Sequence, residues 1–137
     1  MARFSLSVLL IAGVLALAVA PPAISSHVTE VHATAVTLGP GGSVSVSVTV
    51  DCTAGYEYFL ASTVRQKSGK VFNTTGSGVS GTCSTDGPET VTLPLAFGQG
   101  PFRSGRVVVE SFVSVCEPFA FDHCATDTEV VEIRATR

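Results

Sequence analysis

Strict alternation of apolar and polar residues is the clearest pattern in this chain, and it predicts β-strands. Over residues 43–52, valines at every second position alternate with serine, threonine and aspartate and lead to Cys52. A period of two places all the apolar side chains on one face of an extended chain. Residues 90–97 repeat the pattern with Val91, Leu93, Leu95 and Phe97. Pro94 faces the other way and predicts an edge strand or a bulge, because proline has no N–H to donate.

Weaker alternation marks five further strands. They cover residues 28–38, 56–66, 70–75, 106–116 and 128–136. The first of them changes phase midway, which predicts a bulge or a crossing between sheets. Glycine- and proline-rich breaks separate the strands, at residues 39–42, 54–55, 76–81, 86–88 and 98–105. Seven short strands with such breaks predict a two-sheet antiparallel immunoglobulin-like sandwich, with a closed barrel as the alternative.

Composition supports the all-β prediction and one domain over residues 21–137. Beyond residue 20 the chain has 18 valines and 15 threonines but only 4 leucines. Branching at Cβ favours the pleated sheet over the helix. The whole chain of 137 residues has a formal net charge of −3. It is not basic enough to suggest nucleic-acid binding, and about 117 residues are too few for two cores.

The first 20 residues have the pattern of a secretory signal peptide. Arg3 supplies a positive start, an uncharged apolar run covers residues 4–19, and small residues precede Pro21. A membrane anchor is the alternative, but it needs roughly 20 apolar residues and this run is shorter. We therefore predict a secreted or cell-envelope protein with no transmembrane segment after cleavage. The cleavage site stays open between residues 19 and 34.

Four cysteines, Cys52, Cys83, Cys116 and Cys124, lie in the exported part of the chain. In an exported protein an even number of cysteines predicts disulfides. Three pairings are possible, and we predict Cys52 with Cys83 and Cys116 with Cys124. The second pair brackets the span between the two last strands, as a clasp across a hairpin would. A metal site is disfavoured, because zinc ligands usually come in two closely spaced pairs.

No motif for catalysis or cofactor binding is present in the sequence. There is no G-x-S-x-G, no H-E-x-x-H, no P-loop and no G-x-G-x-x-G that opens a helix. Asn73-Thr74-Thr75 is a glycosylation sequon, and in a bacterial chain an ordinary turn is the expected role. We therefore predict no cofactor, no metal and no enzymatic activity.

The span between the last two cysteines is the candidate site. Connecting loops of a sandwich are normally polar, yet this one holds two phenylalanines beside an acid and a histidine. Its residues are Glu117, Pro118, Phe119, Ala120, Phe121, Asp122 and His123. Aromatic side chains on a restrained loop are typical binding anchors. The alternative is that one phenylalanine fills the open end of the sandwich.

The order of these elements resembles a family. It comprises the signal peptide, the valine strand that ends at Cys52, Thr63-Val64-Arg65-Gln66, the glycine-rich run to Cys83, Thr90-Val91-Thr92-Leu93, Phe102-Arg103-Ser104-Gly105-Arg106, the last cysteine pair and Val131-Glu132-Ile133-Arg134. This order resembles small exported actinobacterial proteins with an immunoglobulin-like sandwich and no assigned function. The resemblance covers about residues 43–137 and implies no catalytic residues.

The leading functional hypothesis is a non-enzymatic exported module that binds a protein or cell-envelope partner. One alternative is a small-ligand carrier with an apolar cleft. The other is a protease inhibitor that presents the 116–124 loop. Sandwich folds host many functions, so the fold cannot choose among the three, and the sequence does not specify the oligomeric state.

Overall fold

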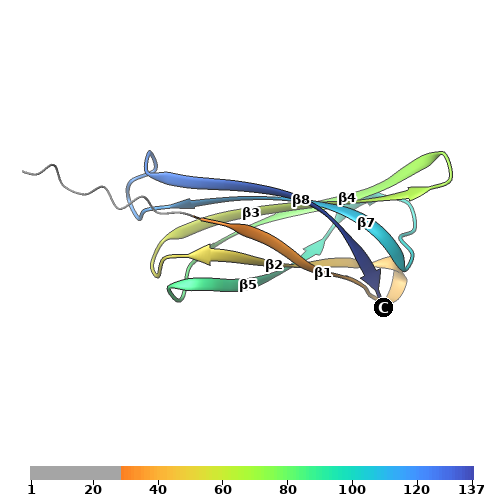
Figure 1. Ribbon diagram of the computed structural model, residues 1–137, viewed down its shortest axis with the longest axis horizontal. Helices are drawn as coiled ribbons and strands as arrows, with labels where there is room; N and C mark the ends of the chain where they lie inside the picture. Colours follow the sequence, from red (N-terminus) through yellow and green to blue (C-terminus); the bar gives the residue numbers. More distant parts are fainter. Residues whose placement is uncertain (1–28) are drawn as a thin grey trace, which may run out of the picture.

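The computed structural model describes residues 29–137, and at residues 97–99 it describes the backbone alone. The predicted signal peptide over residues 1–20 lies outside the described residues. The described part is all-β apart from one 3-10 turn at Pro40–Gly42 (Figure 1). Over these residues, none of the helical structure is long and apolar enough to cross a membrane.

Eight strands make up the fold, and they include all seven segments that the alternation predicts. Their bounds are β1 Val31–Leu38, β2 Val44–Cys52, β3 Glu57–Ser68, β4 Val71–Thr82, β5 Gly87–Leu95, β6 Phe97–Gln99, β7 Gly105–Cys116 and β8 Cys124–Thr136. The short β6 is additional, and β8 begins four residues earlier than residues 128–136 suggested. The all-β prediction is therefore confirmed.

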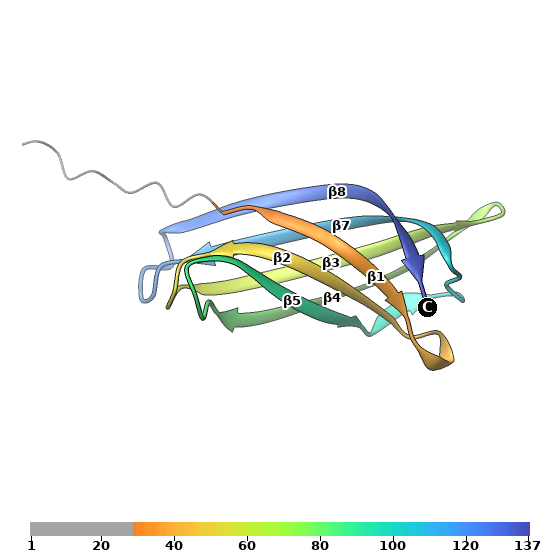
Figure 2. The same ribbon diagram turned by 60° about the horizontal axis from the view of Figure 1, so that its bottom comes forward.

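Hydrogen bonds join the strands into one sheet with the order β5-β2-β1-β8-β7-β3-β4-β6. The expectation of a purely antiparallel arrangement is wrong at one place, since β1 and β8 pair in parallel through Val36↔Ala135 and Thr37↔Thr136. The sheet curls, so that the group β5-β2-β1 faces the group β8-β7-β3-β4 (Figures 1 and 2). The structure thus has one continuous mixed sheet in place of two separate antiparallel ones.

Strand β1 makes this continuity possible because its last residues pair with β2 on one side and with β8 on the other. Its pairing with β2 shifts register between Ala33 and Ala35, which confirms the bulge predicted from the phase change. Before the bulge, β1 has no backbone pairing with β8. There the Val31 N–H donates to Asp127 Oδ2 at 2.9 Å, and the Ala33 N–H donates to Glu129 Oε2 at 2.6 Å. Two carboxylates therefore satisfy backbone donors that would otherwise lack partners.

The core lies between the two groups of strands and is built from the predicted apolar faces. Most of the predicted inward valines and leucines are buried, and Val91 and Val131 are partly buried. The largest fully buried side chains are Val31, Val36, Val46, Val48, Val50, Leu60, Val64, Leu93, Val107, Val109, Val113 and Val115. Burying each such side chain contributes roughly 1.5–3 kcal/mol. As predicted from Pro94, β5 is an edge strand of the sheet.

The glycine-rich run 76–81 is not the break that the sequence suggested, because it continues β4 in register with β3. The glycines make room for aromatic rings on the neighbouring strand. A Cβ at Gly81 would lie 2.6 Å from the Tyr58 hydroxyl, and a Cβ at Gly78 would lie 3.2 Å from the Phe59 ring. Aromatic side chains that cover cross-strand glycines are a known way to stabilise such a strand.

Two buried amides of β3 and β4 fix the connection from β6 to β7. Gln66 accepts from the Arg103 N–H at 2.8 Å and donates to the Arg103 carbonyl at 2.7 Å. Asn73 donates to the Pro101 carbonyl at 2.8 Å. Asn73, the sequon residue, is only 7% exposed and lies within β4. It is part of a strand, and the expected turn at this residue is wrong.

Both predicted disulfides are present. The bond Cys52–Cys83 joins the end of β2 to the residue after β4, and we name it the core disulfide. The bond Cys116–Cys124 joins the end of β7 to the start of β8, and we name it the loop disulfide. The Cα atoms are 5.7 Å apart in the first and 4.0 Å apart in the second.

Candidate binding loop

The loop between β7 and β8 is a short, internally hydrogen-bonded hairpin, and we name residues 117–123 the clasped loop. Cys116 and Cys124 are direct cross-strand partners as well as a disulfide pair. Beyond them, the Glu117 N–H donates to the His123 carbonyl at 3.0 Å, and the His123 N–H donates to the Ala120 carbonyl at 2.8 Å. A covalent bond and backbone hydrogen bonds together limit the conformations of the loop.

The two phenylalanines of the clasped loop point to solvent. Phe119 is 99% exposed and Phe121 is 80% exposed, so neither fills the end of the core. Phe119 has φ 63°, the one positive φ of a non-glycine residue in the part of the chain that the structure describes. This left-handed conformation costs roughly 1–2 kcal/mol for a residue with a Cβ. The loop therefore holds an aromatic ring in water and on a strained backbone.

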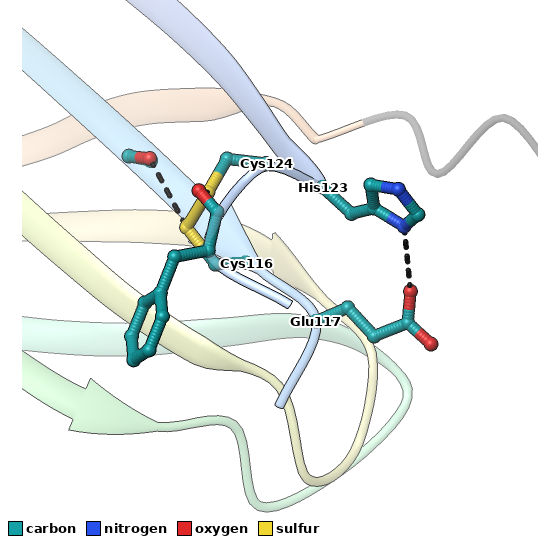
Figure 3. The surroundings of a disulfide bond; sticks show 6 residues. Cys116, Glu117, His123 and Cys124 are labelled. Atoms are coloured by element: carbon teal, nitrogen blue, oxygen red, sulfur yellow. Dashed lines mark hydrogen bonds and ion pairs between the residues drawn. A yellow bond between two sulfur atoms is a disulfide. The ribbon is translucent and has the colours of Figure 1, made fainter. Parts of the chain in front are cut away.

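The charged side chains of the loop face one another beyond the loop disulfide. His123 Nδ1 lies 3.3 Å from Glu117 Oε2, and His123 Nε2 lies 3.7 Å from Asp122 Oδ2. Figure 3 shows Glu117 and His123 on the solvent side of the two cysteines. All three side chains are at least 48% exposed. Such exposed pairs contribute little to stability. They place two carboxylates at the rim of the loop, where a partner could contact them.

An open hollow of about 450 Å³ lies beside the loop on the outer face of the sheet. Phe121 forms part of its wall, and Phe59 of β3, 47% exposed, forms another part. The remaining lining residues are Glu57, Tyr58, Ser80, Gly81, Thr82, Ser114 and Cys116. Burial, with a smaller contribution from Glu89, raises the pKa of the Tyr58 phenol. The Tyr58 side chain packs against the core, and its phenol stays neutral there.

Sequence reasoning missed Phe59 and Phe112. Inward alternation through Tyr58 and Leu60 leaves Phe59 on the outer face, and Phe112 occupies the same phase on β7. Phe112 is 37% exposed. The sequence did contain a signal for them: each is an aromatic residue at a strand position where alternation predicts a polar one.

A second histidine lies on the strands, away from the loop. His32 is on β1 beside Glu129 of β8, with 3.1 Å between His32 Nδ1 and Glu129 Oε1. Every cysteine is in a disulfide. Over residues 29–137 no group of three or more histidine, cysteine, aspartate or glutamate residues is arranged to hold a metal ion.

Comparison with known proteins gives no relative for this chain. No family model, no curated protein and no solved structure matches it. The functional argument therefore depends on the residues and geometry of the chain itself.

Proposed function

We propose that this protein is a non-enzymatic exported module that binds a protein partner through the clasped loop. One observation carries the proposal: Phe119 and Phe121 stand almost fully exposed on a loop closed by a disulfide and by backbone hydrogen bonds. Aromatic side chains bury large areas and are frequent hot spots of binding interfaces. Exposing two of them in water is unfavourable unless a partner covers them.

Preorganisation supports the same conclusion. Binding normally costs roughly 0.5–1.5 kcal/mol for each mobile side chain that becomes ordered, and a flexible loop costs more. In the clasped loop, ring closure at Cys116–Cys124 and the left-handed Phe119 already restrict the backbone. A partner would therefore gain the contact area of both rings at a reduced ordering cost.

The proposed architecture is an immunoglobulin-like sandwich from a secreted or cell-envelope protein. The groups β5-β2-β1 and β8-β7-β3-β4 face each other, and just two residue pairs of β1 and β8 join them in the sheet. That arrangement agrees with a sandwich whose first strand belongs to both sheets. Two disulfides and the absence of free cysteines agree with an oxidising compartment. Export also agrees with the signal-peptide pattern and with the resemblance to exported actinobacterial proteins.

The hollow gives weaker support to a small-ligand carrier. Carrier sites usually bury 70–90% or more of a ligand's surface, whereas this hollow is open and Phe59 beside it is half-exposed. It fits better as an extension of the surface that Phe121 begins. Protease inhibition is a narrower form of the binding proposal, in which the partner of the constrained loop is a protease.

The test is capture of binding partners from the protein's own culture medium. Wild-type protein, Phe119→Ala, Phe121→Ala and the matched control Val71→Ala would be immobilised, and captured proteins identified by mass spectrometry. Val71 is 62% exposed and lies on the β3–β4 hairpin. We expect either loop variant to lose the captured protein while keeping its melting temperature, and the control to retain it. Equal capture by all four proteins would contradict the proposal.

A further inference from the structure

Charges in the described chain separate along its long axis. The cross-strand partners Ser62, Ser111 and Glu129 lie near the middle of β3, β7 and β8. We use them to divide the molecule into two halves. The half with both disulfides, counted with Glu129 on the dividing line, contains nine of the eleven acids. They are Glu30, Asp51, Glu57, Asp86, Glu89, Glu117, Asp122, Asp127 and Glu129. The other half contains all seven lysines and arginines of residues 29–137: Arg65, Lys67, Lys70, Arg103, Arg106, Arg134 and Arg137.

Three of these cations occupy adjacent strands on the outer face of the sheet, and we name Lys67, Arg106 and Arg134 the cationic row. Arg106 and Arg134 are direct cross-strand partners. Lys67 lies on β3 two residues beyond the pair Arg65↔Val108, where the pairing of β3 with β7 ends. Like charges directly opposite each other on neighbouring strands are destabilising. The fold therefore keeps an arrangement that is unfavourable without an anionic partner.

The protein itself neutralises this half only in part. Arg106 lies 3.5 Å from Glu132, and Arg65 lies 3.4 Å from Glu110. All four side chains are at least 47% exposed, so these pairs are weak. No other ion pair involves a lysine or arginine within the described residues.

The acidic half is too far away to compensate. Ten residues of β3 separate Glu57 from Lys67, which is about 33 Å of extended chain. Salt at physiological strength screens charges over about 8 Å. The acidic half therefore leaves the cationic row to solvent ions or to another molecule.

We propose that this molecule is a second copy of the chain, whose clasped loop docks on the cationic row. The proposal rests on the proposed function, because it names the partner of the same loop. Charge complementarity carries it: Glu117 and Asp122 lie on the rim of the loop and face the cations of the next molecule. Next to the row, Val108 and Val130 are 38% and 64% exposed on the same outer face, and they offer apolar contact to the two phenylalanines.

Such an interface joins different ends of the two molecules, so it is heterologous. Each added copy leaves one loop and one cationic row unused, and association can continue into open chains. Because charges steer the contact, it weakens as salt rises.

Sedimentation velocity of the disulfide-bonded protein tests the proposal. We expect the average mass to rise with protein concentration at about 20 mM salt and to return to the monomer at about 500 mM salt. Arg106→Gln/Arg134→Gln and Glu117→Gln/Asp122→Asn should each weaken association at least about tenfold. An equimolar mixture of the two variants retains one intact loop and one intact row, so it should form a 1:1 dimer that does not grow. Thr90→Glu/Thr92→Glu and Thr90→Lys/Thr92→Lys match the charge changes on exposed positions of β5, and both should associate as the wild type does.

Three results would overturn the proposal. The first is a wild type that stays monomeric at low salt. In that case, loop-dependent capture of another protein leaves the proposed function standing, and absence of such capture removes both. The second is equal weakening by the β5 controls, which would assign the effect to net charge. The third is a monomer that binds sodium polyphosphate through Arg106 and Arg134, which would assign the cationic row to an anionic polymer.

Discussion

The two disulfides lie at the same end of the molecule but have different structural roles. The core disulfide joins Cys52 and Cys83, which are 4% and 3% exposed and 31 residues apart. It connects strands from the two facing groups of the curled sheet. The loop disulfide joins Cys116 and Cys124, which are eight residues apart and already paired in the sheet. One bond holds the fold together, and the other restrains a loop that buries neither of its aromatic rings.

This contrast separates what stabilises the protein from what it can present to a partner. A cross-link stabilises mainly by restricting the unfolded chain, and the effect grows with the size of the closed ring. The core disulfide closes a large ring and is packed in the hydrophobic core. The loop disulfide closes a small ring around residues with few contacts of their own. If this disulfide served stability alone, its loop would not need two exposed phenylalanines.

Removal of the core disulfide should have the largest effect. Cys52→Ala/Cys83→Ala should lower the free energy of unfolding by about 3.7 kcal/mol, the value that ring closure gives for a span of this length. Urea titration followed by circular dichroism would measure it. A loss below about 1 kcal/mol would mean that the facing strand groups do not depend on this bond.

Removal of the loop disulfide should cost less stability and more binding. Ring closure alone gives about 2.6 kcal/mol for Cys116→Ala/Cys124→Ala. Because pairing of β7 with β8 already holds the two residues together, we expect the measured loss to lie below that value. Partner capture should fall with it, since the loop must then be ordered on binding. If stability falls more than in the core variant, the roles assigned to the two disulfides are reversed.

The strained residue of the loop gives a smaller effect of opposite sign. Phe119→Asn should raise the free energy of unfolding by about 0.5–1 kcal/mol, because asparagine tolerates a left-handed backbone and the exposed ring packs on nothing. Phe119→Ala is the matched control. It keeps the Cβ at φ 63° and should leave stability within about 0.5 kcal/mol. Both variants should lose capture. Equal stabilities for the two would show that the backbone carries no strain.

The fold was predictable to the extent that side-chain alternation determines it. Strands β2 and β7 each bury one face, and alternation defines that face without any tertiary information. The disulfide pairing was predicted correctly although the end of β4 and the start of β8 were misplaced. Export and absence of enzymatic activity stay predictions.

What the sequence could not show depends on contacts between strands. Gly78 and Gly81 look like a loop until the rings of Phe59 and Tyr58 are placed over them. The parallel pairing of β1 with β8 depends on where β1 approaches β8 while it stays paired with β2. In the candidate site, the loop itself was visible in the sequence. Phe59 lines the hollow beside the loop because the strand register brings it near Phe121. The local sequence pattern does not specify that register.

The smallest predicted effect concerns an ion pair between the facing strand groups. His32 of β1 lies 3.1 Å from Glu129 of β8 and 3.5 Å from Glu30. The hydrogen bond to Glu129 is the main cause that raises the pKa of His32 above its ordinary value of 6.5, with Glu30 adding to the rise. Since the imidazolium is more favourable in the folded protein than in the unfolded chain, protonation stabilises the fold.

The sign of the pH dependence follows from that shift. The stabilisation is fully present below the unfolded pKa of 6.5 and disappears as pH rises through the higher folded pKa. His32 is 58% exposed, so solvent screens the pair and the effect should be small. Proton NMR titration of the His32 ring should show a midpoint above 6.5, and urea midpoints measured across pH 5 to 9 should fall more for the wild type than for His32→Asn. Identical pH profiles for the two proteins would leave the core disulfide and the β1–β8 backbone pairing as the connections that matter.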